Sequence, residues 1–123
     1  MKKTLLTLTL AVSLLFLSGC GKKADENKPT SDVQAEAAKM NAQDLKAMAM
    51  NYKNVIENKK ADIEKIAAKL KDIPVTQLLG GQAKQLKADI DNLNKSVAAL
   101  KERFQIYYDQ LKAKGGDLSG LQI

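Results

Sequence analysis

The side chains that could carry out chemistry in this chain are few. Its 123 residues include one cysteine, Cys20, and neither histidine nor tryptophan. Zinc sites built from cysteine and histidine are therefore excluded, as are nucleophiles that histidine activates. A single thiol also excludes a disulfide within the chain. Glycine is scarce in the body of the sequence, so no loop that could cradle a phosphate is visible.

Carboxylates are the remaining candidates for catalysis. Paired carboxylates do acid–base work where a pocket drives their pKa values apart. Here they are expected on solvated helix faces beside lysines, at Glu57, Asp62, Glu64, Asp89, Asp91 and Glu102. A chain this thin is not expected to enclose a pocket around them. We therefore predict no catalytic residue, no metal ligand, no cofactor and no small-molecule substrate, and do not expect an enzyme.

The residues before Cys20 form a segmented leader. The chain begins with the basic run Met1-Lys2-Lys3, continues through an apolar stretch over residues 4–17, and then places the small pair Ser18-Gly19 before the cysteine. This order is the pattern of a secretory signal peptide. The apolar stretch is shorter than the ~20 residues that a membrane-spanning helix needs. Residues 1–19 are therefore expected to be a cleaved leader.

Leu17-Ser18-Gly19-Cys20 resembles the lipobox of bacterial lipoproteins. The resemblance covers residues 1 to about 21 and implies cleavage between Gly19 and Cys20, a diacylglyceryl thioether on Cys20, and a new amine open to acylation. Two or more chains anchor a protein stably, whereas one binds only marginally. In Gram-negative lipoproteins an Asp after the cysteine favours the inner membrane. Gly21 stands there instead, which points to the outer membrane, facing the periplasm.

Two other interpretations of the leader remain open, a signal peptide without lipid and a buried N-terminal helix.

Beyond the leader, the charge of the chain limits which classes of partner it could bind. The net charge of +6 falls to +4 without Lys2 and Lys3, and Arg103 is the single arginine among lysines spread between acids. A nucleic-acid binder would show a clustered basic face, so none is predicted. The excess suits anionic headgroups or wall polymers, or is a solvated surface.

Residues 20–31 are expected to be the lipidated cysteine and a flexible polar tether. Residues 21–31 contain no large apolar side chain and cannot bury a core. Ser31 and Gln34 have the spacing of a helix capping box. The first helix is therefore expected to begin at about residue 32.

Apolar residues then recur in alternating steps of three and four, which predicts an all-α fold. The average step of 3.5 keeps a stripe of side chains, here called the seam, facing a partner helix. The first seam run is Ala35, Ala38, Ala42, Leu45, Ala49, Tyr52, Ile56, Lys59, Ile63, Ile66, Leu70 and Ile73. The second is Leu79, Ala83, Leu86, Ile90, Leu93, Val97, Leu100, Phe104, Tyr107 and Leu111. Both runs together predict two packed helices.

A turn separates the two runs. Pro74 and the pair Gly80-Gly81 disfavour helix, which places the turn within residues 72–82. Because a short turn makes antiparallel neighbours, we expect a long, coiled-coil-like helical hairpin over residues 32–114.

The expected bounds of the two helices are about 32–72 and 82–114, followed by a flexible tail over residues 115–123. Apolar side chains away from the seam, such as Val33 and Met48, suggest that a further surface covers the hairpin. That cover would be a second copy or another protein.

Two residues are candidate partner contacts. Lys59 is the one ionisable residue on the seam. It either directs its ammonium out to solvent, or it specifies the register of helix pairing or the choice of partner. Tyr108 lies off the seam beside Tyr107, either as part of a small aromatic cluster or as a binding contact.

The function favoured by the sequence is a lipid-anchored cell-envelope protein that presents a helical hairpin for protein–protein interaction or self-assembly. The alternatives are a membrane-active lipoprotein and an inhibitor or assembly factor. The absence of tryptophan and the narrow apolar stripe argue against a helix lying in the bilayer interface.

Overall fold

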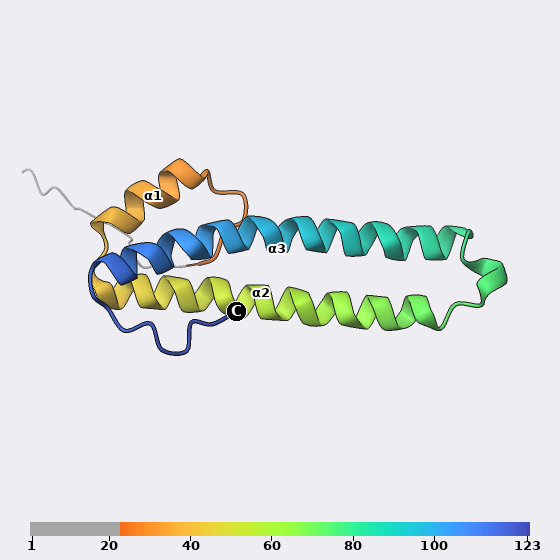
Figure 1. The fold of residues 1–123 in the computed structure, drawn as a ribbon. Coiled ribbons are helices and arrows are strands. Elements are labelled where there is room, and N and C mark those ends of the chain that lie inside the picture. The colour runs from red at the N-terminus through yellow and green to blue at the C-terminus, as the bar shows by residue number, and fades with distance from the viewer. Residues whose placement is uncertain (1–22) are drawn as a thin grey trace, which may run out of the picture.

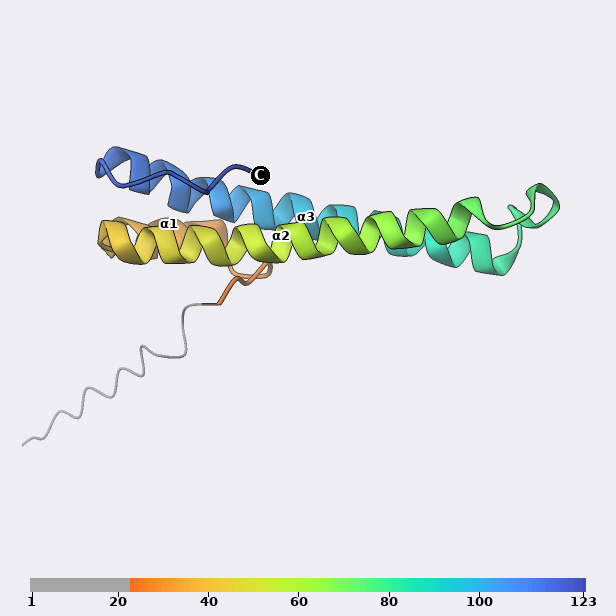
Figure 2. The same cartoon turned by 90° about the horizontal axis from the view of Figure 1, so that it is seen from below.

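The computed structural model of the protein describes residues 23–123. The elements in chain order are α1 (Thr30–Lys39), α2 (Ala42–Lys71), the short 3-10 helix η2 (Val75–Gln77) and α3 (Gly81–Ala113). The helices α2 and α3 run antiparallel side by side, and α1 packs against α3 near the open end of the pair (Figures 1 and 2). The predicted all-α hairpin is confirmed, while the leader and Cys20 lie outside the described residues.

Local signals explain where the long helices begin and end. The Asn41 side chain accepts a hydrogen bond from the Asp44 amide at 2.8 Å, which caps the start of α2. After α2, Pro74 begins the 3-10 turn. At the end of α3, Gly115 has a φ of 68°, which lets the Gly116 amide reach the Leu111 carbonyl at 2.9 Å. The turn therefore lies within the predicted residues 72–82.

The prediction of one helix over residues 32–72 is wrong. Met40 is extended, with a ψ of 148°, and separates α1 from α2. Val33 and Ala37 form the buried face of α1, whereas the predicted seam residues Ala35 and Ala38 are exposed. Folding back onto α3 buries Val33, the one branched apolar side chain of α1, and a straight helix with an alanine seam would not.

The predicted capping box is also wrong. The helix α1 begins one residue before Ser31, with Pro29 as its N-cap residue, and no side chain caps it. Pro29 is extended, with a ψ of 138°, and the helix starts directly after it. Ser31 therefore falls inside the first turn of α1 and not at the position where its side chain could cap the helix.

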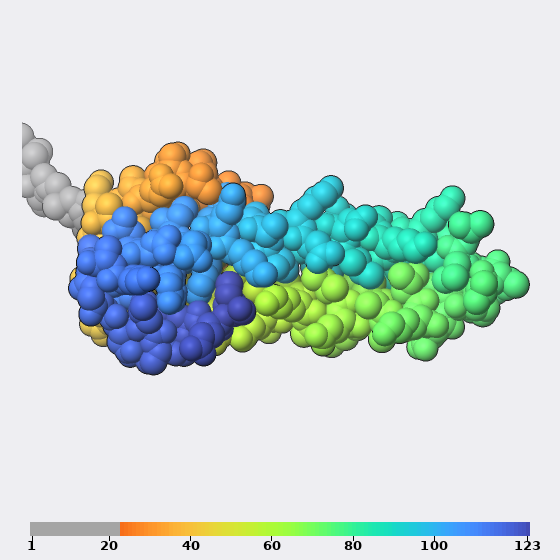
Figure 3. Space-filling model, in the orientation of Figure 1, coloured from red at the N-terminus to blue at the C-terminus, as the bar shows by residue number. Residues whose placement is uncertain are grey.

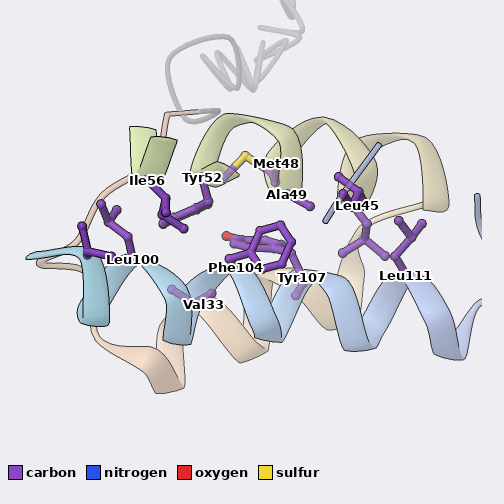
Figure 4. Close-up of a cluster of buried hydrophobic side chains, with 13 residues drawn as sticks. Val33, Leu45, Met48, Ala49, Tyr52, Ile56, Leu100, Phe104, Tyr107 and Leu111 are labelled. Carbon is purple, nitrogen blue, oxygen red and sulfur yellow. The ribbon is translucent and has the colours of Figure 1, made fainter. Parts of the chain in front are cut away.

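We divide the molecule into two parts. The base consists of residues 23–58, which include α1, together with residues 96–123. The arm consists of residues 59–95. Figure 3 shows the base as the thick end of the molecule and the arm as its narrower extension. The buried hydrophobic cluster lies wholly in the base (Figure 4). Its largest side chains are Tyr52, Tyr107, Leu45, Met48, Ile56, Leu100 and Leu111. Since every residue of this cluster lies within 23–123, this part of the chain carries its own core.

The arm is two helices thick, and its core is correspondingly thin. The seam pattern continues there as predicted except at Leu79, which is exposed, and Ala83 is fully buried. The other large seam side chains of the arm are only half-buried, namely Ile63, Ile66, Leu70, Ile73, Leu86, Ile90 and Leu93. Two helices alone cannot enclose side chains of this size, so the arm keeps an apolar stripe partly open to solvent.

The prediction of a flexible tail over residues 115–123 is wrong. The tail turns back and runs alongside the base (Figures 1 and 2), and Leu121 is 1 % exposed within the hydrophobic cluster. The Lys46 ammonium pairs with Asp117 and holds the pKa of that carboxyl well below its usual range. The Lys53 ammonium donates to the Gly120 carbonyl at 2.7 Å. Leu121 fills the space beside α2 and α3. The glycine-rich sequence of the tail did not indicate that it would dock there.

Candidate interaction surfaces

Residues 23–29, which we call the strap, lie within the base and bind to each of its three helices. The Tyr52 hydroxyl accepts a hydrogen bond from the Asp25 amide at 3.1 Å and lies 3.2 Å from the Asp25 carbonyl, to which it can donate. Lys28 also pairs with Glu36 of α1. The expectation that the polar tether extends to residue 31 is therefore corrected, because the strap makes specific contacts and Ser31 belongs to α1.

Arg103 ties the strap to α3. Its guanidinium donates twice to the Lys28 carbonyl, at 2.8 Å from Nε and 2.6 Å from Nη2. The third nitrogen, Nη1, donates to the Ala99 carbonyl at 2.7 Å. The side chain is 8 % exposed, so these bonds satisfy a charge that would otherwise be costly to bury. A lone arginine among lysines was the one sequence signal that could have indicated this role, because only its planar fork donates in this way.

Lys59, the first candidate partner contact, faces the strap. Its ammonium lies 3.8 Å from the Glu26 carboxylate. The Glu26 Oε2 atom is buried and has no hydrogen-bond partner within the described part of the chain. Lys59 therefore neutralises a half-buried carboxylate of its own chain. This contact accounts for the lysine on the seam without any external partner.

Tyr108, the second candidate, lies where α3 meets the tail. Its ring packs on Phe104 with centroids 5.9 Å apart and planes inclined at 32°. Both rings line a shallow groove of about 510 Å³ with Leu118 and Leu121 of the tail. Tyr108 is half-buried, so part of its ring is available to a partner. The two sequence candidates thus lie on separate surfaces, Lys59 beside the strap at the start of the arm and Tyr108 beside the tail on the base.

The predicted carboxylates do not form a catalytic arrangement among the described residues. Glu57 lies 3.7 Å from Lys53, Asp62 lies 3.8 Å from Lys65, and Glu102 lies 3.9 Å from Arg103. No group of histidine, cysteine or acidic side chains in residues 23–123 could hold a metal ion. Gly19 and Cys20, the predicted cleavage and lipidation residues, lie outside the described range.

The end of the arm shows what sequence reasoning missed. Val75 and Leu79 are both 83 % exposed, and Ile123 at 45 % is the other exposed large hydrophobic residue described. Val75 and Leu79 lie at the turn between α2 and α3, which is the end of the molecule farthest from the strap (Figure 1). Leu79 was predicted to continue the seam and does not. A turn of nine residues between two antiparallel helices leaves no third element to cover it.

Comparisons with protein families, with curated proteins and with solved structures find no match to this chain. Among the helices of residues 23–123, none combines the length and the apolar character that crossing a bilayer requires. The case for function therefore depends on the surfaces described above.

Proposed function

We propose that this protein is a lipid-anchored component of a bacterial cell envelope that presents the arm of its hairpin to another protein or to a second copy of itself. The observation that carries the proposal is the contrast between base and arm. The base is closed by α1, the strap and the tail, whereas the arm leaves the side chains of Ile66, Ile90 and their seam neighbours half-buried. A partner helix laid along this stripe would complete the packing, as in other helical bundles.

The strap supports a close attachment to the membrane. Lys23 and Ala24 lie against Asn51, Asn54 and Val55 near the middle of α2. Only residues 20–22 separate the strap from the expected lipid, a span of roughly 10 Å when fully extended. An anchor on Cys20 would therefore hold the flank of the base close to the headgroups and leave the arm free to meet a partner.

Photo-cross-linking in cells tests the arm. Asn94 is exposed and lies one helical turn beyond Ile90 on the same side of α3. A photoreactive residue in its place should form a discrete cross-link with a protein, and the mass of the product distinguishes a second copy from another partner. The matched control is Lys112, which is exposed on the base part of α3. Equal cross-linking from both positions would contradict the proposal.

The anchor is tested separately by the intact mass of the protein extracted from membranes. We expect a chain beginning at Cys20 and carrying diacylglycerol, and we expect Cys20→Ser to remain uncleaved and unlipidated. Fractionation of the envelope then tests the outer-membrane location that Gly21 suggests. A mature protein with a free thiol would remove the anchor from the proposal and leave the interaction of the arm to be judged by its own experiment.

A further inference from the structure

The turn at the end of the arm presents two aliphatic side chains on an ordered backbone. Within the turn, the Gln77 amide donates to the Pro74 carbonyl at 2.8 Å, and the Gly80 amide donates to the Gln77 carbonyl at 2.9 Å. Val75 and Leu79, each 83 % exposed, project from this framework. These two side chains therefore present apolar area to solvent at the end of the arm.

The same end of the molecule holds its excess positive charge. We call residues 65–88 the tip. The tip carries five lysines and one acid, Asp72, whereas the rest of the described chain carries twelve basic and thirteen acidic side chains. All five lysines are exposed. They are Lys65, Lys69, Lys71, Lys84 and Lys87. The sequence-based expectation of lysines spread between acids therefore does not hold in the tip.

Most of these lysines have no counter-charge on the protein. Lys65 lies 3.8 Å from Asp62. The other four have no carboxylate within 4 Å in the part of the chain that the structure describes. The tip thus combines an exposed aliphatic pair with a surrounding set of unpaired ammonium groups. A partner that binds both the aliphatic pair and the ammonium groups must offer an apolar interior behind a layer of negative charge.

We propose that the tip docks onto an anionic lipid surface, with Val75 and Leu79 inserted among the headgroups and the lysines bound to them. A bilayer containing anionic lipid has this layered chemistry. Protein interfaces instead favour arginine and are depleted in lysine, and the tip contains five lysines and no arginine. Lysine is a point charge on a flexible stem, which suits a fluid layer of headgroups.

The two contributions have measurable sizes. A lysine close to an anionic membrane strengthens binding by about fivefold, and the effect is screened by salt. Inserting an aliphatic side chain that is exposed in water adds on the order of tenfold each. The proposal depends neither on lipid at Cys20 nor on a protein partner of the arm, because both groups of side chains belong to the tip.

Vesicle co-sedimentation tests the proposal with a soluble protein of residues 21–123, which includes the whole hydrophobic cluster. We expect binding to phosphatidylglycerol–phosphatidylcholine vesicles, little binding to phosphatidylcholine alone, and loss of binding at ~1 M salt. The variant Lys84→Gln/Lys87→Gln should bind about 25-fold more weakly. The variant Val75→Ser/Leu79→Ser should lose on the order of 100-fold. Circular dichroism confirms that each variant stays helical.

Matched controls at the base remove the same chemistry elsewhere. Lys101→Gln/Lys112→Gln neutralises two exposed lysines of the base, and Ile123→Ser removes an exposed aliphatic side chain from the tail. Both controls should bind within about twofold of the unaltered protein. Equal losses in the controls, or unchanged binding by the Val75→Ser/Leu79→Ser variant, would overturn the proposal. So would binding to soluble polyglutamate with no binding to vesicles, which would indicate an acidic protein partner.

Discussion

Removing one oxygen atom from each ring of the stacked pair Tyr52 and Tyr107 should have opposite effects on stability. The two rings lie 5.5 Å apart, with planes inclined at 29°, in the centre of the base. The hydroxyl of Tyr52 contacts the Asp25 backbone. The hydroxyl of Tyr107 is buried and has no hydrogen-bond partner among residues 23–123. Tyr→Phe at each position preserves the ring and isolates the hydroxyl, so each variant is the control for the other.

The loss at Tyr52 follows from the two contacts. Each hydrogen bond contributes about 0.5 to 1.5 kcal/mol net. The Asp25 groups released by Tyr52→Phe lie on an exposed residue and can bond to water, so no large desolvation penalty is added. We expect a loss of about 1 to 2 kcal/mol, accompanied by release of the strap. Exchange of the Asp25 amide with solvent should accelerate because its bond to the hydroxyl is gone.

The gain at Tyr107 follows from the cost of burying an unpaired polar group. That cost is about 1 to 3 kcal/mol in mutational data. Phenylalanine has the same ring and no hydroxyl, and we therefore expect Tyr107→Phe to raise the free energy of unfolding by about 1 kcal/mol. Exchange of the Asp25 amide should not change, because the Tyr107 hydroxyl makes no hydrogen bond to the strap.

Urea unfolding followed by circular dichroism gives both free energies for the soluble protein of residues 21–123. The two variants should move the midpoint in opposite directions. A Tyr107→Phe variant less stable than the unaltered protein by more than about 1 kcal/mol would refute the reasoning, because its hydroxyl would then contribute a favourable bond. An unchanged Asp25 exchange rate in Tyr52→Phe would refute the role of Tyr52 in holding the strap.

Three further predictions concern the base. Burial raises the pKa of Tyr107 from 10 to about 12. The unfolded chain therefore loses this proton first, and the free energy of unfolding should fall by about 2 to 3 kcal/mol as pH rises from 10 to 12 and above, with no effect of this group below pH 10. Alkaline urea titrations should show this fall, and Tyr107→Phe should lessen it. Arg103→Gln should cost about 2 to 4 kcal/mol by removing charge-assisted bonds to the Lys28 carbonyl, and a loss under about 0.5 kcal/mol in urea would contradict that role. Leu121→Ala should cost about 2 to 4 kcal/mol because it leaves a cavity in the core, whereas Ile123→Ala should be nearly neutral; equal thermal midpoints for these two variants would show that the tail is not docked.

Local signals accounted for the parts of the fold that were predicted. The three-and-four spacing from Leu45 onward placed the buried faces of α2 and α3, because helical periodicity depends on residues one turn apart. Pro74 and the glycine pair located the turn for a similar reason. The same spacing misled at Ala35 and Ala38, where small side chains fit the pattern but bury too little area to determine the direction of the helix.

The candidate sites show the same division. Lys59 was identified as unusual from the seam alone, but its contact with Glu26 could not be predicted, because nothing local brings the strap to that face of α2. Arg103 escaped notice although it binds a carbonyl 75 positions away in the sequence. The excess of lysines over acidic residues in the tip could be counted from the sequence. Its significance emerged only when Val75 and Leu79 proved to be exposed on the turn that joins the basic segments.

The sequence by itself determined that this protein is helical, that two long helices pair, and where they turn, since each of these depends on spacing and on residues that start or stop a helix. Tertiary structure alone decided that α1 folds back, that the strap and the tail dock, and that the base is closed while the arm stays partly open. Those outcomes depend on hydrogen bonds and burial between segments far apart in the chain. A polar strap or a glycine-rich tail becomes ordered only when distant helices supply the groups that compensate its loss of entropy.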